Sequence, residues 1–99
     1  MEKPVCERTV EIKNAVGLHM RPAMKFIDIA NRFSSDVRVS NDEVTVDGKS
    51  IIQMCTLRAT YGTRLKIRAE GSDAEQAVNA LQELVEVRLF DEPPPEGKG

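Results

Sequence analysis

The stretch Gly17-Leu18-His19-Met20-Arg21-Pro22-Ala23 marks the start of the first helix of this chain and contains its only histidine. Pro22 has no backbone N–H and its φ is restricted to a helical value, so a helix tolerates it only in the first turn. After Pro22, apolar residues recur at the spacing of one helical face, at Ala23, Phe26, Ile27, Ala30 and Phe33. We therefore predict a helix over residues 19–33, with His19 at or beside its N-cap.

A histidine at a helix N-cap lies where anions are favoured. The N–H groups of the first turn have no partner within the helix, and the positive end of the helix dipole points outward. Arg21 adds a permanent positive charge whose planar donors match the oxygens of a phosphate group. This combination predicts a site that carries a phosphoryl group, with His19 as the nucleophile. The spacing alone equally allows His19 to be an ordinary surface or capping residue.

Four segments alternate apolar and polar residues, which is typical of strands with one buried face. They cover residues 8–13, 37–39, 44–46 and 64–69, and Asn41-Asp42-Glu43 is a hairpin turn between the second and the third. On the face away from the core we expect polar residues that remain in water, among them Thr9, Glu11, Lys66 and Arg68.

Two further helices are indicated by capping boxes, in which an N-cap side chain and the side chain three positions later bond each other's backbone N–H. Ser50-Ile51-Ile52-Gln53 begins a short helix that reaches about Leu57. This helix is too apolar to be buried completely, so part of it should form an exposed patch. Ser72-Asp73-Ala74-Glu75 begins the last helix, whose predicted core-facing residues are Ala74, Ala77, Val78, Leu81, Leu84, Val85 and Leu89.

The predicted element order is β-α-β-β-α-β-α, in a chain of 99 residues that is long enough for one small domain. Such an order favours an α+β fold, in which one open, mostly antiparallel sheet carries helices on one face. We expect this single domain to cover residues 1–90. Residues 91–99 are acidic and proline-rich, cannot continue a helix and are expected to be disordered.

The composition argues against several classes of function. The net charge is −2, the 14 basic residues form no run, and the chain has no Trp, one Tyr and three Phe, so nucleic acid is not an expected partner. No apolar segment is long enough to span a bilayer and no signal peptide is recognisable, which predicts a cytoplasmic protein with Cys6 and Cys55 reduced. These two cysteines and one histidine lack the spacing of metal ligands, so neither a metal nor another cofactor is expected.

Two motifs resemble the signatures of one family, the histidine-containing phosphocarrier proteins (HPr) of the bacterial phosphotransferase system. Residues 17–23 are similar to the family's active-site signature, and Val46-Asp47-Gly48-Lys49-Ser50-Ile51-Ile52 is similar to the signature around its regulatory serine. The resemblance covers about residues 9–87 and includes Gly62-Thr63 and Ala69-Glu70-Gly71 at the two ends of the last strand. It implies an open-faced β-sandwich, a four-stranded antiparallel sheet in the order 1-4-2-3 with three helices on one face, which agrees with the element order above.

The resemblance also implies roles for the residues at matching positions. His19 would accept at Nδ1 a phosphoryl group that Enzyme I takes from phosphoenolpyruvate, Arg21 would stabilise it, and the group would pass to acceptor domains of a sugar phosphotransferase system. The chain would then be a carrier in a relay rather than an independent enzyme, and nothing requires more than a monomer. Ser50 would be the target of a serine kinase in some members. The residues expected to dock these partners are Met20, Met24, Lys49, Ile51, Ile52 and Cys55.

Some residues depart from the family's pattern. Met20 and Arg58 stand where the family usually has small residues, and Gln53 replaces a common glycine, so partner and kinase specificity can differ here. Two other functions remain open. One is a regulatory phosphocarrier of the nitrogen-related branch, and the other is an interaction module in which His19 is never phosphorylated.

Overall fold

The elements of the chain follow the predicted order. In the computed structural model, which describes residues 3–91, the strands are β1 (Val5–Glu11), β2 (Asp36–Ser40), β3 (Thr45–Asp47) and β4 (Arg64–Glu70). The helices are α1 (Met20–Ala30), α2 (Ile51–Cys55) and α3 (Ala74–Gln82). Helix α3 continues through a π-helical segment (Glu83–Val87), and a terminal turn (Leu89–Asp91) follows. The predicted order β-α-β-β-α-β-α is therefore confirmed.

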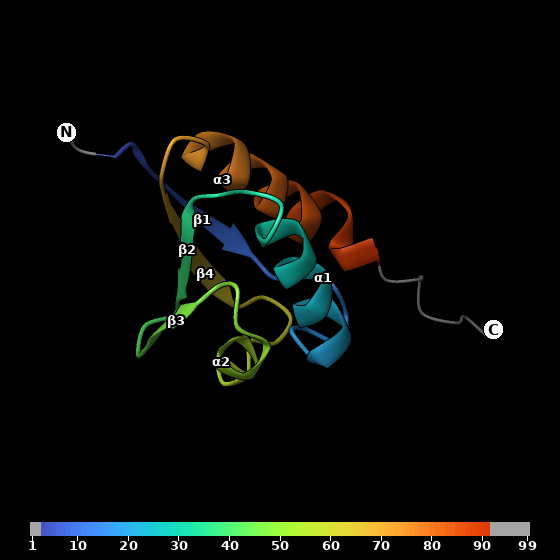
Figure 1. Cartoon of the computed structure of the whole chain (residues 1–99). Coiled ribbons are helices and arrows are strands. Elements are labelled where there is room, and N and C mark those ends of the chain that lie inside the picture. Colours follow the sequence, from blue (N-terminus) through green and yellow to red (C-terminus); the bar gives the residue numbers. More distant parts are fainter. Residues whose placement is uncertain (1–2, 92–99) are drawn as a thin grey trace.

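The strands form one antiparallel sheet in the order β1-β4-β2-β3, so the expected order 1-4-2-3 is confirmed for the described residues. Figure 1 shows α1, α2 and α3 on the same side of this sheet. The register places Val39 of β2 opposite Ile67 of β4 and also opposite Val46 of β3, and all three side chains are buried. The covered face of the sheet is thus the apolar half of the alternation read from the sequence.

The opposite face of the sheet carries the polar half of the alternation. Thr9, Lys66 and Arg68 are exposed there, as predicted, while Glu11 is half-buried. Arg68 pairs with Glu7 on the neighbouring strand, with an N–O distance of 3.6 Å. This face therefore stays in contact with water, and the helices leave it uncovered.

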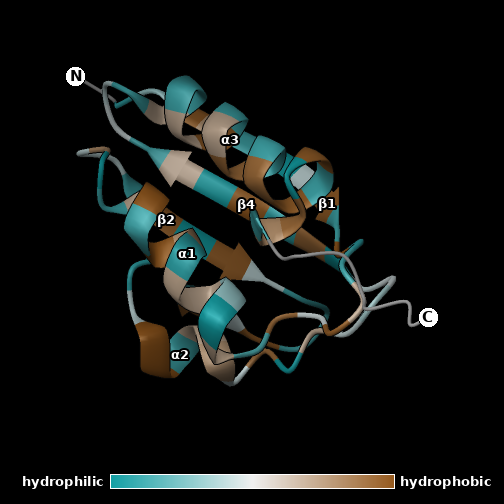
Figure 2. Cartoon of the chain, turned by 90° about the vertical axis from the view of Figure 1, so that its right-hand side faces the viewer, coloured by the Kyte–Doolittle hydropathy of each residue, from teal (hydrophilic) through white to brown (hydrophobic). Residues whose placement is uncertain are grey.

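Helix α1 lies between α2 and α3 (Figure 2) and is buried through Pro22, Ala23, Phe26, Ile29 and Ala30. Ile29 was not among the predicted core residues, whereas the predicted Ile27 and Phe33 are only half-buried. The helix also ends at Ala30, earlier than predicted. The N–H groups of Arg32 and Phe33 bond to carbonyls three residues back, at 3.0 and 3.2 Å, so the chain tightens after Ala30 and leaves the α-helical geometry.

The capping box predicted for α2 is half correct. Ser50 is the N-cap, and its hydroxyl accepts a hydrogen bond from the Gln53 backbone N–H at 3.3 Å. The Gln53 side chain does not reach back to Ser50. Its Oε1 accepts from the backbone N–H of Asp47 at 2.9 Å, because the Ser50 N–H already donates to the Asp47 carbonyl at 3.1 Å.

The capping box predicted for α3 is wrong. The helix begins at Ala74, and Asp73, which precedes it, makes no capping bond with its side chain. The Asp73 carboxylate instead accepts hydrogen bonds from the backbone N–H groups of Ser34 and Ser35, at 2.9 and 3.0 Å, and from their hydroxyl groups. The Asp73 carboxylate thus satisfies the donors of the loop between α1 and β2. The sequence pattern could not predict this, because the loop and Asp73 are far apart in the chain.

The end of the described chain also differs from the prediction. Leu89 is only half-buried, and Phe90 fills the core position with 2% of its surface exposed. The wider turn of the π-helical segment shifts the residues that follow it around the helix axis, and Leu89, Phe90 and Asp91 then adopt positive φ values of 51°, 57° and 55°. Asp91, which the sequence assigned to the tail, belongs to this terminal turn, and residues 92–99 lie outside the described residues.

Two further predictions concern chemistry outside the site. Cys6 and Cys55 are both free thiols. Within residues 3–91, no helix combines the length and the apolar character needed to cross a bilayer.

Candidate functional site

His19 is the N-cap of α1, as predicted. Its backbone is extended, with φ −91° and ψ −175°, and its carbonyl accepts the first helical bond from Ala23 N at 2.9 Å. Its imidazole is exposed and makes no capping bond. Because Pro22 has no N–H, the first-turn donors that remain beside His19 are the N–H groups of Met20 and Arg21.

The loop before His19 packs against the segment between α2 and β4. Leu18 is buried and its N–H donates to the Ala59 carbonyl at 2.8 Å. Gly17 has a φ of +77°, and a Cβ there would lie 2.6 Å from the same Ala59 oxygen. Asn14 is buried and its Nδ2 donates to the Gly17 carbonyl at 2.8 Å. These contacts hold the backbone that leads into His19 at the start of α1.

His19 lies between two surface hollows. The first is lined by Val16, His19, Arg21, Pro22, Lys25, Phe90 and Asp91. The second is lined by Leu18, His19, Met20, Cys55, Arg58, Ala59 and Thr60. The structure thus brings the predicted pair His19 and Arg21 together in one hollow, and it adds charged residues that the sequence reasoning did not assign to the site.

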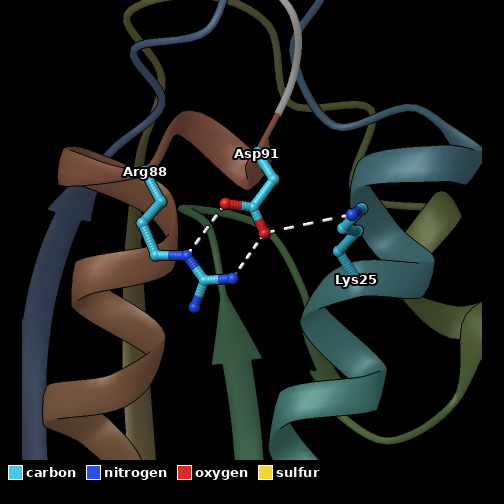
Figure 3. Close-up of polar contacts among 3 residues, drawn as sticks. All are labelled: Lys25, Arg88 and Asp91. Atoms are coloured by element: carbon cyan, nitrogen blue, oxygen red, sulfur yellow. Dashed lines mark hydrogen bonds and ion pairs between the residues drawn. The ribbon is translucent and has the colours of Figure 1, made fainter.

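The missed charges of the first hollow are Lys25 and Asp91, shown with Arg88 in Figure 3. Arg88 donates to the Asp91 carboxylate from Nε at 2.9 Å and also from Nη2, whereas Lys25 Nζ lies 3.9 Å from the nearer carboxylate oxygen. The hydrogen bonds from Arg88 lower the pKa of Asp91, so this carboxylate stays ionised at neutral pH. One feature of the sequence could have indicated that Lys25 lies near the site. Lys25 follows Arg21 by four residues, so both lie on the same face of the helix.

The predicted docking residues fall into two groups. Met20, Met24 and Ile52 are 60%, 57% and 78% exposed on the adjoining helices α1 and α2, and we call these three residues the apolar patch. Ile51 and Cys55 are half-buried against the core. Cys55 and Met20 also line the second hollow, so the patch extends to the edge of His19.

Lys49 and Ser50 are engaged in structural bonds. The half-buried Lys49 donates from Nζ to the Phe33 carbonyl at 2.9 Å, which connects the segment before α2 to the turn that follows α1. Ser50 caps α2 with its hydroxyl. Neither residue is among the described residues that line the two hollows beside His19. No cluster of three or more potential metal-ligating side chains occurs among residues 3–91.

Comparison with known proteins places this geometry in a family. The family model described as "PTS HPr component phosphorylation site" matches residues 6–87. The chain is 46% identical to phosphocarrier protein HPr of Pseudomonas aeruginosa, over 84% of this chain and 92% of that protein. It is 42% identical to phosphocarrier protein NPr of Proteus mirabilis, over 86% and 94% of the two chains.

Solved structures agree with these relatives. An HPr from Thermoanaerobacter tengcongensis is 43% identical and superposes with a TM-score of 0.83, over 89% of this chain and 98% of the other. An HPr from Bacillus anthracis is 38% identical, with a TM-score of 0.80 over 83% and 98% of the two chains. The match extends over most of the chain in sequence and in structure, and this chain therefore belongs to the HPr family of phosphocarrier proteins of the phosphotransferase system.

Proposed function

We propose that His19 is the residue of this phosphocarrier that accepts the phosphoryl group, and that Arg21 stabilises the group there. The observation that carries the proposal is the uncapped start of α1, where the exposed imidazole of His19 shares a hollow with Arg21. The N–H groups of Met20 and Arg21, the helix dipole and the guanidinium all favour an anion at this point. A family of phosphocarriers needs one such residue, and this is the chain's only histidine.

The transfer step requires little more than position and charge. The Nδ1 lone pair of neutral His19 attacks the phosphorus of a phosphohistidine on Enzyme I. The new N–P bond forms as the donor N–P bond breaks, and the donor imidazole leaves with that electron pair. Nε2 of His19 keeps its proton throughout. Transfer to an acceptor domain is the same exchange in reverse, so the site must bind the phosphoryl group only moderately.

The test is incubation with phosphoenolpyruvate and Enzyme I, comparing the native protein with His19→Ala. We expect one acid-labile phosphate on the native protein and none on the variant, measured by intact mass at neutral and acid pH. Phosphate on both proteins would refute His19 as the acceptor. Phosphate on neither, with the Enzyme I active on another HPr, would favour an interaction module in which His19 is not phosphorylated.

The pathway of this phosphocarrier depends on which of two classes of acceptor domain receives the phosphoryl group. The sugar phosphotransferase role is supported by the HPr relatives, and the nitrogen-related regulatory role is supported by the similarity to NPr of Proteus mirabilis. Phosphorylated protein would be presented with a sugar-type and a nitrogen-type acceptor domain at equal concentrations. We expect faster transfer to the sugar-type domain, and the opposite order would assign the chain to the nitrogen-related branch.

The apolar patch is the proposed docking surface for Enzyme I and the acceptor domains, with Ile51, Cys55 and Lys49 beside it. An exposed cluster of large apolar side chains next to the reacting histidine is the expected form of such a surface. Ile52→Glu should slow phosphorylation of His19 without lowering stability, because 78% of the Ile52 surface is exposed. An unchanged rate would place the docking surface elsewhere.

We expect the protein to act as a cytoplasmic monomer. Ser50 is its proposed regulatory phosphorylation site. The residue is half-buried and bonds to the backbone of α2, so a kinase would have to displace that bond. A phosphate there would introduce negative charge beside the proposed docking residues Ile51 and Ile52 and disfavour apolar contact with a partner. Incubation with an HPr serine kinase and ATP should label the native protein and not Ser50→Ala.

A further inference from the structure

The first hollow holds two cations that lie one helical turn apart on α1. Arg21 and Lys25 both line it together with His19. Like charges at this spacing repel each other and weaken the helix. The first turn of α1 contains no acidic residue to offset them. The helix therefore maintains an arrangement that favours a strongly charged anion in front of both side chains.

The terminal turn places a carboxylate at the rim of the same hollow. Asp91 receives its close hydrogen bonds from Arg88, while Lys25 Nζ stays 3.9 Å away, beyond hydrogen-bond distance (Figure 3). About 44% of the Lys25 side chain is exposed. The ammonium group of Lys25 is therefore attracted to Asp91 and retains its donors for another acceptor.

The terminal turn that carries Asp91 has an unfavourable backbone conformation. Leu89, Phe90 and Asp91 all have positive φ, a region that costs free energy for residues other than glycine. Phe90 is buried and lines the hollow beside Asp91, so the core holds the turn in place. Strained backbone of this kind is concentrated at functional sites.

We propose that Lys25 is a second phosphoryl-binding residue, and that Asp91 competes for it. This inference rests on the proposed role of His19. In the free protein Asp91 keeps the Lys25 ammonium at the hollow. When the dianionic phosphoryl group occupies His19, Lys25 turns from Asp91 to the phosphoryl oxygens, and Asp91 remains bonded to Arg88. Asp91 also repels the phosphoryl group, which favours release to an acceptor.

The proposal predicts opposite effects for the two residues. Lys25→Gln should shift the phosphorylation equilibrium with Enzyme I three- to tenfold toward phosphorylated Enzyme I, and Asp91→Asn should shift it toward the phosphorylated carrier. Lys25→Arg should restore most of the loss because it keeps the charge. The matched control is Lys66→Gln, which removes a lysine on the uncovered face of the sheet.

The decisive readout is the pKa of the phosphoryl group on His19, followed by ³¹P NMR between pH 5.5 and 9. A nearby cation lowers this pKa, so Lys25→Gln should raise it and Asp91→Asn should lower it, while Lys66→Gln leaves it unchanged. If Lys25→Gln and Asp91→Asn both titrate like the control, the role of Lys25 is refuted and that of His19 stands. If the native protein carries no phosphate on His19, the proposed function and this inference fail together.

Discussion

Helix α2 begins at Ser50, whose hydroxyl accepts a hydrogen bond from Gln53 N, whereas α1 begins at His19, whose imidazole makes no such bond. The residue three positions after the N-cap explains the difference. In α2 that residue is Gln53, which offers an N–H to the cap, but in α1 it is Pro22, which has none. The start of α2 is thus closed by its own side chain, and the start of α1 is left open for an anion.

In this small domain, a stabilising cap and the proposed functional site therefore lie at different helix starts. The cap of α2 satisfies a donor of its own helix, while the donors at the start of α1 remain for the phosphoryl group that we propose there. Rigid contacts in the preceding loop, from Leu18 and Gly17 to Ala59, hold the open start in position without using its donors. Substitutions at the helix starts and in this loop test the contrast.

His19→Asn should abolish phosphorylation completely and leave the free energy of unfolding within about 0.5 kcal/mol of the native value. The amide side chain is a good N-cap in general, but Pro22 removes the donor at the third helical position and leaves only the Arg21 N–H, at the second, for the cap, so little cap energy can be gained. Denaturant unfolding and intact mass after incubation with Enzyme I measure the two effects. A stabilisation of more than about 1 kcal/mol would show that the start of α1 can be capped after all.

Gly17→Ala should destabilise the protein by about 2 kcal/mol or more. The positive φ at this position is unfavourable for alanine, and the new Cβ would lie only 2.6 Å from the Ala59 oxygen. The loop that positions His19 would shift, so phosphorylation should slow as well. Gly62→Ala is the matched control, since that glycine also has a positive φ but a Cβ there meets nothing within 4 Å. Equal losses of stability in the two variants would contradict the role given to the Ala59 contact.

Ser50→Ala should lower the free energy of unfolding by about 1 kcal/mol, the usual effect of removing an N-cap hydroxyl. His19 should still be phosphorylated by Enzyme I at close to the native rate. Thermal unfolding and a phosphorylation time course provide the two measurements. If the variant unfolds like the native protein, the 3.3 Å bond to Gln53 N contributes nothing to stability.

The start of α3 extends the comparison to acid pH. Hydrogen bonds from Ser35 and Ser34 lower the pKa of the Asp73 carboxyl below its ordinary value of 3.8. A carboxyl whose folded pKa is lower than its unfolded pKa stabilises the protein above the unfolded value, and this contribution is lost as the pH falls toward the folded pKa. We therefore expect Asp73→Asn to flatten the loss of stability below pH 3.8 compared with the native protein, measured by thermal unfolding at a series of acid pH values.

Asp91 provides the control for the acid experiment, because its pKa is lowered in the same direction by Arg88. Asp73→Asn should therefore leave a residual acid dependence, and adding Asp91→Asn to it should reduce that dependence further. An acid limb that is unchanged in Asp73→Asn would show that its bonds to the loop between α1 and β2 do not stabilise the fold.

Much of the fold could be predicted because it depends on local patterns. Alternation along β1 to β4 defined the strands and their buried face, and Pro22 and Ser50 defined the starts of α1 and α2 within one residue. The candidate pair His19 and Arg21 lies within a single stretch, so its proximity was also readable. The two motifs of the family resemblance are equally local.

The rest depended on contacts between residues distant in the sequence. The Asp73 carboxylate could have capped its own helix, and only the packing of α3 beside the loop at Ser34 and Ser35 gave it nearer donors. Phe90 reached the core because the π-helical segment changed the register of the preceding helix. Local propensity cannot decide between such alternatives, because the same side chain can be accommodated by neighbours in the sequence or by residues that are distant in it.

The element order, the apolar faces and the histidine at an open helix start all follow from local sequence, because periodicity and backbone restrictions act within a few residues. The surroundings of that histidine depend instead on tertiary contacts. Folding brought Lys25 together with Asp91 and Arg88 from the far end of the chain, and Arg58 to the second hollow. Charges that are far apart in the sequence interact only when folding brings them close together in space, and no local pattern encodes that proximity.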